Sequence, residues 1–243
     1  MTSAVHDIPA ADTATASSVG GRVRVWDVPT RVFHWLFALS FAGAWLTAEA
    51  DGLESLHLML GYTFAGLIGF RLIWGMVGTK YARFGSFLYS PARVAGYLRS
   101  LPTRSPEHHL GHNPAGALAI FAMIVLAIAI SASGIATYQE IGGEWLEDLH
   151  EGAANVMLAI VVIHIAGVVA SSLLHRENLV AAMVTGWKRG EPAQGIRRPH
   201  RILGALLLAA VLGFWWAYQS GAADAYLPSP PAKSEQDRHH DDD

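Results

Sequence analysis

Four histidines lie within long apolar segments or at their ends, and their spacing suggests metal ligation. His150 and His164 are 14 residues apart on one predicted helix, so their rings project from nearly the same face, about 21 Å apart along the axis. His34 and His57 lie on the first two apolar segments. Ligating side chains are costly within hydrocarbon and by default indicate function. These residues are therefore candidates to hold two metal centres stacked across a bilayer.

The segments that would position these histidines are long enough to cross a membrane. Of the 243 residues, 52% are hydrophobic and 15% charged, whereas a soluble domain has about a quarter charged residues. Each apolar segment approaches or exceeds the roughly 20 residues that a spanning helix needs. The sequence predicts an all-α membrane protein, a four-helix transmembrane bundle followed by a fifth, C-terminal transmembrane helix. The five segments are residues 32–48, 56–77, 114–136, 150–174 and 202–218.

The distribution of charge between these segments predicts their orientation. Basic and acidic connections alternate, and basic connections remain cytoplasmic. The N-terminus is therefore expected in the cytoplasm and the C-terminus in the periplasm of a bacterial inner-membrane protein. The basic residues are Arg22, Arg24 and Arg31, then Lys80, Arg83, Arg93, Arg99 and Arg104, then Arg176, Lys188, Arg189, Arg197, Arg198 and Arg201. The acidic residues are Glu49, Asp51 and Glu54, then Glu140, Glu144, Glu147 and Asp148.

Four regions follow from this organisation. Residues 1–21 are expected to form a disordered cytoplasmic tail and residues 22–190 the four-helix domain that holds the metal centres. Residues 191–219 form a linker and the fifth helix, and residues 220–243 an acidic periplasmic tail. Asn113 as a cap and Pro114 in the first turn are expected to begin the third spanning helix.

With this topology the histidines fall at two depths. His34 pairs with His164 near the cytoplasmic side, and His57 pairs with His150 near the periplasmic side. Each pair could fill both axial positions of one haem iron, which suits electron transfer because no position stays open for a substrate. The chain has no cysteine, which excludes thiolate ligation and covalent haem attachment. The expected cofactors are two non-covalent b-type haems.

Other residues of the second segment fit such a cofactor. Gly61, Gly66 and Gly69 would let a flat macrocycle approach the backbone. Arg71 lies 14 residues after His57 and so reaches the depth of His164. A haem propionate would be its natural partner. The alternative is that Arg71 extends toward the lipid headgroups.

The remaining histidines have simpler interpretations. His108, His109 and His112 lie in a basic connection without a neighbouring cysteine or carboxylate, which favours a solvated loop over a metal cluster. His239 and His240 precede three aspartates at the C-terminus. This tail is interpreted as acidic disorder that faces a basic partner.

Several motifs occur over about residues 22–190. They are Val23-Arg24-Val25-Trp26-Asp27, Arg31-Val32-Phe33-His34-Trp35, His57, Gly61-Tyr62, Phe70-Arg71, Trp74-Gly75, Tyr81-Ala82-Arg83-Phe84, Gly111-His112-Asn113-Pro114 and the His150/His164 pair. Together they resemble bacterial cytochrome b-561 and the b-type cytochrome subunits of nickel–iron hydrogenases. The resemblance implies two b haems ligated as above, with Gly61, Tyr62 and Arg71 as cofactor-binding residues. It also implies electron transfer between the quinone pool and a periplasmic redox protein. The fifth helix and acidic tail lie outside the shared core, which favours a c-type cytochrome over a hydrogenase as partner.

Three alternatives remain open. A quinone reductase that oxidises superoxide or another small molecule is disfavoured, because the acidic outer loops would repel an anion. A transporter with a proton path is disfavoured by the absence of inverted repeats and of an intramembrane carboxylate. A membrane anchor without haem is the third. Whether the chain is itself a quinol or quinone oxidoreductase stays open.

Overall fold

The computed structural model describes residues 21–100, 109–223 and 225–227. The expected tails therefore lie almost wholly outside the described residues, as do His108, Arg104 and the C-terminal His239 and His240.

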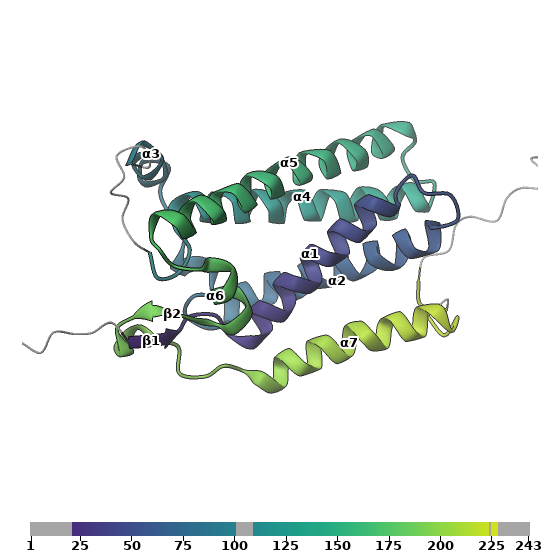
Figure 1. Cartoon of the computed structure of the whole chain (residues 1–243). Coiled ribbons are helices and arrows are strands. Elements are labelled where there is room, and N and C mark those ends of the chain that lie inside the picture. The colour runs from purple at the N-terminus through teal and green to yellow at the C-terminus, as the bar shows by residue number, and fades with distance from the viewer. Residues whose placement is uncertain (1–20, 101–108, 224, 228–243) are drawn as a thin grey trace, which may run out of the picture.

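Five long helices run side by side in the described chain (Figure 1). They coincide with the five apolar segments, so the prediction of a mainly helical membrane protein is confirmed. The fourth begins at Glu144 rather than near residue 150, because Glu144 and Glu147 in its first turn interact favourably with the positive end of the helix dipole. The helices are α1 (Val28–Thr47), α2 (Glu54–Val77), α4 (Pro114–Tyr138), α5 (Glu144–Leu174) and α7 (Arg201–Gln219).

Side-chain caps begin two of these helices. The Asn113 side chain accepts a hydrogen bond of 2.7 Å from the amide of Gly116, and Pro114 occupies the first position of α4. This cap was predicted from the sequence. Asp27 caps α1 in the same way, through a 2.7 Å bond from the amide of Thr30. Each cap satisfies a backbone donor that the helix leaves free.

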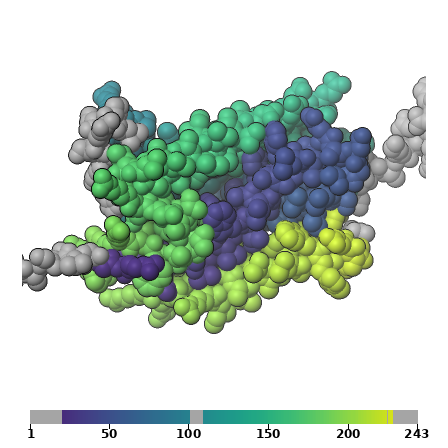
Figure 2. Space-filling model, viewed as in Figure 1, coloured from purple at the N-terminus to yellow at the C-terminus, as the bar shows by residue number. Residues whose placement is uncertain are grey.

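Helices α1, α2, α4 and α5 share one core, as in a four-helix bundle. Buried side chains from all four meet there. Because lipid tails are as apolar as these side chains, close van der Waals packing between the helices holds the bundle together. Helix α7 packs outside the bundle, along α1 and α2 (Figure 2). Its Val211 joins Phe33 of α1 and Leu67 of α2 in a second cluster. The shared core comprises Phe41, Phe64, Ile68, Ala127, Ile130, Ala153 and Met157.

Four described helices are long and apolar enough to cross a membrane, namely α2, α4, α5 and α7. Large apolar side chains remain exposed along them, such as Ile163 at 68% and Leu173 at 76% on α5, as expected of a surface that faces lipid. Helix α1 has 20 residues but is not among these four. It is less apolar because it contains Arg31 and His34. The chain is thus a helical membrane protein with four candidate spans, and helix α1 packs against them.

The short elements gather at one end of the bundle, called the strand end below (Figure 1). Strands β1 (Gly21–Arg24) and β2 (Trp187–Gly190) pair antiparallel, with Gly21 opposite Gly190. Val23, Val25 and Trp26 form a small core there with Ala182. The opposite end, called the loop end, carries the α1–α2 and α4–α5 connections, residues 48–53 and 139–143. The other short elements are η1 (Phe84–Ser86), α3 (Pro91–Ser100), α6 (Leu179–Thr185) and η3 (Pro192–Gln194).

Candidate functional site

At the loop end, the first turn of α2 and an early turn of α5 bring His57 and His150 together. Their ring centroids are 6.3 Å apart with an interplanar angle of 71°. Metal–imidazole bonds are about 2 Å long and a ring nitrogen lies about 1 Å from its centroid, so two axial rings on one metal have centroids about 6 Å apart. The observed separation therefore fits a metal held between the rings.

The outer nitrogens of both rings are already engaged. His57 Nδ1 lies 2.8 Å from the carbonyl oxygen of Ala44, and His150 Nδ1 lies 2.9 Å from that of Ile130. A carbonyl oxygen can only accept, so each Nδ1 carries the proton and each Nε2 keeps its lone pair. Ligating histidines commonly donate to a backbone carbonyl in this way, which fixes the tautomer. Each Nε2 is thus chemically able to bind a metal.

Gly134 of α4 is a part of this site that sequence reasoning missed. A Cβ atom on Gly134 would lie 2.7 Å from Cε1 of His150, a distance that real side chains do not tolerate. The His150 ring therefore occupies space that only glycine leaves open. The signal in the sequence was a glycine within an apolar helical segment, but its partner could not be known before helices α4 and α5 were placed together.

At the strand end, His34 of α1 and His164 of α5 lie within electrostatic range of each other. Both rings are half-buried. The Nδ1 atom of His34 is buried and has no hydrogen-bond partner among the described residues. An unsatisfied buried nitrogen is costly unless a ligand completes it. This pair therefore also fits a bound metal cofactor.

Space for a flat cofactor exists beside the ligand helices. A Cβ atom on Gly61, Gly66 or Gly69 of α2 would meet nothing within 4 Å, and the same holds for Gly167 of α5. Gly61 follows His57 by one helical turn and Gly167 follows His164 by almost one, so these openings lie on the histidine-bearing faces. Gly66 and Gly167 lie on the exposed surface, whereas Gly61 and Gly69 are half-buried.

Tyr62 follows Gly61 on α2, and its hydroxyl group is left without a partner. The hydroxyl oxygen is buried and forms no hydrogen bond with the described residues. It lies within electrostatic range of Tyr138 and Tyr218, at the ends of α4 and α7. Because a buried hydroxyl normally pairs, Tyr62 has an O–H donor available to a bound group.

Arg71 is buried on α2 with 5% of its surface exposed. Its Nη1 donates a 2.9 Å hydrogen bond to the carbonyl of Ala82, and the guanidinium lies 4.6 Å from the ring centroid of Phe84. The alternative in which Arg71 extends toward the lipid headgroups requires an exposed side chain, and the buried side chain does not fit it. Arg71 organises the loop that follows α2 and retains further N–H donors.

Asp27 is the carboxylate that interacts electrostatically with Arg71, and it is fully buried. Asp27 accepts from the amide of Thr30, from Trp74 Nε1 at 3.2 Å and from the Thr79 hydroxyl at 2.6 Å. These donors satisfy the carboxylate, and it interacts with Arg71 only through space. The positive charge of Arg71 is thus incompletely compensated by direct contacts.

The expectation of a solvated histidine loop is wrong for His112. Its ring packs between Trp26 and Phe87, with centroid distances of 4.7 and 4.4 Å. Burial, followed by the nearby charges of Arg71 and Lys188, lowers the pKa of His112 to about 3. The described residues 109–112 are half-buried, because aromatic side chains of the strand end flank the His112 ring, which the polar sequence of the loop does not indicate. Within the described residues, which leave out His108, no group of three or more metal-binding side chains occurs.

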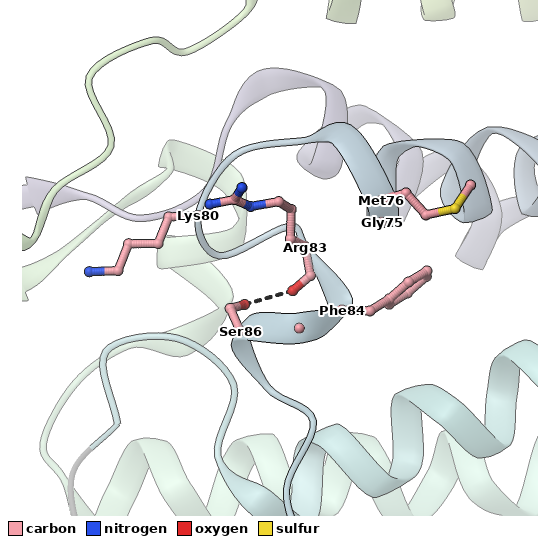
Figure 3. A pocket seen from close by; sticks show the side chains of 7 residues that line it. Gly75, Met76, Lys80, Arg83, Phe84 and Ser86 are labelled. Atoms are coloured by element: carbon pink, nitrogen blue, oxygen red, sulfur yellow. Dashed lines mark hydrogen bonds between the residues drawn. The ribbon is translucent and has the colours of Figure 1, made fainter.

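A hollow of about 560 Å³ opens where α2 ends (Figure 3). Phe84 lies between this hollow and Arg71. Its ring lines the hollow and also contacts the guanidinium group of Arg71. Gly75 is required here because any Cβ would overlap the Phe84 ring. The hollow therefore depends on the same loop that Arg71 organises.

Comparison with known proteins agrees with this geometry. The model of the prokaryotic cytochrome b561 family matches residues 25–186. The chain belongs to this family. The matched region includes His34, His57, His150, His164 and Arg71, and the resemblance inferred from the sequence motifs is confirmed. This cytochrome is therefore a membrane protein of electron transport that uses b-type haem, whereas α7 lies outside the matched region.

Among curated proteins, this cytochrome is similar to several that are named as probable hydrogenase subunits. It is 27% identical over 214 residues to the probable Ni/Fe-hydrogenase B-type cytochrome subunit of Azotobacter vinelandii, covering 68% of this chain and 88% of that protein. It is 24% identical over 229 residues to the corresponding subunit of Rhizobium leguminosarum bv. viciae, covering 75% of this chain and 95% of that protein. No solved structure matches the chain significantly.

Proposed function

We propose that this cytochrome holds two b haems and passes electrons between the quinone pool and a soluble redox protein. His34 and His164 would ligate the strand-end haem, and His57 and His150 the loop-end haem. When bound, each haem supplies a one-electron iron couple, and axial histidines on both faces favour electron transfer over chemistry at an open iron. The proposal rests chiefly on the 6.3 Å spacing of the His57 and His150 rings together with their carbonyl-bound Nδ1 atoms.

The remaining site residues would orient these cofactors. Arg71 has N–H donors left to bind a propionate of the strand-end haem, since its described contacts are one carbonyl and one aromatic face. Gly61, with Gly66 and Gly69, leaves space for the macrocycle. The buried hydroxyl of Tyr62 would donate a hydrogen bond near the loop-end haem.

The membrane orientation is proposed from the charges at the two ends. The strand end carries exposed basic residues such as Arg189, Arg197 and Arg198, so it would face the cytoplasm of a bacterial inner membrane. Helix α1 would cross together with α2, which gives five spans and a periplasmic C-terminus. His150 and His164 would then lie about 21 Å apart along the membrane normal.

The partner would dock at the loop end, next to His57 and His150. This end carries an acidic surface of fully solvent-facing carboxylates, which would attract a basic face and raise the association rate. The names of the relatives support a hydrogenase as partner, while a c-type cytochrome fits the same charge. Oxidation of superoxide fits poorly because the surface would repel an anion. The acidic surface comprises Glu49, Asp51, Glu54, Glu140, Glu144, Glu147 and Asp148.

The optical spectrum of the purified membrane protein tests this proposal. Dithionite reduction should produce b-type α bands, and haem extraction should give two haems per polypeptide. A proton-path transporter or a haem-less anchor would give no such bands. One haem per polypeptide would contradict the two-centre arrangement, and reduction by a quinol in the same sample tests the exchange with quinone.

A further inference from the structure

His112 presents a buried imidazole that the proposed electron-transfer path does not yet use. It lies in the loop before α4, where the Tyr89 hydroxyl donates a 2.9 Å hydrogen bond to its carbonyl oxygen. Trp26 and Phe87 flank the ring. The Nδ1 atom is buried without a hydrogen-bond partner among the described residues. A buried ring nitrogen of this kind requires a partner.

The surroundings of His112 indicate the charge of that partner. Arg71, Lys188, His34 and His164 all lie within electrostatic range of its ring. Lys188 is paired with Glu177 at 3.2 Å, and the Asp27 carboxylate already accepts from three donors. Both carboxylates of the described neighbourhood are thus engaged. The region between His112 and Arg71 is complementary to one further anion.

The protonation state of the ring agrees with a hydrogen-bond donor. Burial keeps the pKa of His112 far below neutrality, so the imidazole is neutral and carries a single N–H. It can donate to a carboxylate without adding a second buried positive charge beside Arg71. A hydrogen bond from a neutral donor to an ionised acceptor is still among the stronger kinds.

We propose that His112 donates a hydrogen bond to a propionate of the haem held by His34 and His164, next to Arg71. This inference rests on the proposed function, because it requires a haem at the strand end. His112 is a positioning residue here and not an iron ligand. Its donor would offset the negative charge of the propionate and so raise the reduction potential of this haem.

Three variants of the intact protein test the role of His112. His112→Phe keeps an aromatic ring between Trp26 and Phe87 but removes the donor, whereas His112→Gln retains a donor. His109→Phe makes the matching change in the same loop. Resonance Raman spectroscopy reports the propionate bending modes, and a redox titration reports both haems. We expect His112→Phe to shift the propionate band and lower the potential of the strand-end haem only, with partial recovery in His112→Gln and no change in His109→Phe.

The outcomes separate this inference from the proposed function. If His34→Ala retains both haems, no haem is held at the strand end and the proposed function fails. If His34→Ala loses one haem but His112→Phe matches the wild type in band and potential, His112 is only a packing residue and the inference fails. Should His112→Phe not fold, His112→Gln decides, because a weaker amide donor must still move the propionate band.

The hollow at the end of α2 carries a second, independent inference. It combines cations and a hydroxyl with apolar surface. Above it on α2, Ile73, Met76 and Val77 are 60, 66 and 68% exposed. None of the described acids forms a salt bridge with the cations of the hollow. The polar lining is Lys80, Arg83 and Ser86, and the apolar lining is Gly75, Met76 and Phe84 (Figure 3).

This combination matches an anionic phospholipid. A helix that ends at Val77 places the hollow at the boundary between hydrocarbon and headgroups, and basic pockets at this depth bind anionic headgroups. We infer that Lys80 and Arg83 bind the lipid phosphate while an acyl chain lies on the exposed apolar face of α2. Nothing in this inference depends on the haems.

Lipid retention in nanodiscs tests the lipid site. Native mass spectrometry would compare phosphatidylglycerol with phosphatidylcholine for the wild type, the double variant Lys80→Ala/Arg83→Ala and the control Arg197→Ala/Arg198→Ala, which removes two exposed charges at the same end. At about 1 kcal/mol per cation, retention of phosphatidylglycerol should fall about thirtyfold in the first variant and stay unchanged in the control. Equal loss in both variants, or equal retention of the two lipids, overturns the site. If inorganic phosphate stabilises the wild type, but not Lys80→Ala/Arg83→Ala, in phosphatidylcholine discs, the hollow binds the free anion and the lipid assignment is overturned.

Discussion

The His150 ring lies against the bare backbone of Gly134, so that a Cβ atom there would approach Cε1 to 2.7 Å. The same ring donates to the carbonyl of Ile130, one turn earlier on α4. Helix α4 therefore sets the position of His150 in two ways, through a steric limit and a hydrogen bond. The loop-end site depends on a helix that contributes no ligand of its own.

This relationship predicts a loss of haem from Gly134→Ala. The added methyl group must displace the His150 ring, so occupancy of the loop-end haem should fall while the strand-end haem is retained. Haem content per polypeptide and the reduced spectrum measure this. Gly152→Ala on α5 is the control, because its Cβ would meet nothing within 4 Å. Equal haem content in both variants would contradict the steric argument.

The pairing of ligands by depth predicts two phenotypes among four variants. His34→Ala and His164→Ala should lose the same haem, whereas His57→Ala and His150→Ala should lose the other, because a six-coordinate iron loses half of its axial ligation in each case. Haem quantification together with low-temperature spectra distinguishes the two components. Loss of the same component in His34→Ala and His57→Ala would show the pairing to be wrong.

Arg71→Leu should lower the midpoint potential of the strand-end haem by tens of millivolts, because a nearby positive charge is lost. The loop-end haem should barely respond, since helical rise separates it from Arg71 by about 20 Å. Arg71→Lys keeps the charge but loses the fork that contacts Ala82 and Phe84, so its potential should stay closer to the wild type. A redox titration measures all three proteins. Unchanged potentials in Arg71→Leu would leave Arg71 with a structural role alone.

The acidic surface predicts that partner reduction depends on salt. Electrostatic steering falls steeply with ionic strength, so the stopped-flow rate should decrease between low and physiological salt. Neutralising Glu144, Glu147 and Asp148 should slow the reaction more than deleting residues 228–243, because these carboxylates lie on the first turns of α5, before His150. Glu191→Gln at the strand end is the control. A rate independent of salt, or a larger effect of the tail deletion, argues for another docking face.

A hydrogen bond joins helix α7 to α2, from Trp215 Nε1 to the hydroxyl of Thr63 at 2.8 Å. Trp215→Phe should therefore lower the free energy of unfolding by about 0.6 kcal/mol, the average for interhelical hydrogen bonds in membranes. Trp216→Phe is the control, since Trp216 is 72% exposed. Unfolding in mixed micelles measures the difference, and equal stability of the two variants would mean that the hydrogen bond contributes nothing.

Local regularities let the sequence alone predict the long helices and the order of the histidines along them. Apolar length identifies the five helical segments because a bilayer requires about 20 apolar residues. The helical repeat is constant, so the 14-residue interval between His150 and His164 already indicated one face and two depths. The Asn113–Pro114 cap was likewise predictable, because capping involves only neighbouring residues.

Only the tertiary structure decided the features that depend on which elements meet. His112 reads as part of a polar loop, yet Trp26 from the N-terminal strand region and Phe87 bury it. Arg71 donates to the carbonyl of Ala82, in a loop beyond its own helix. Gly134 cannot be replaced by a larger residue only because α5 places His150 against it. Burial and steric limits arise from contacts between segments that are far apart in the chain. They therefore cannot be predicted from the periodicity of a single segment.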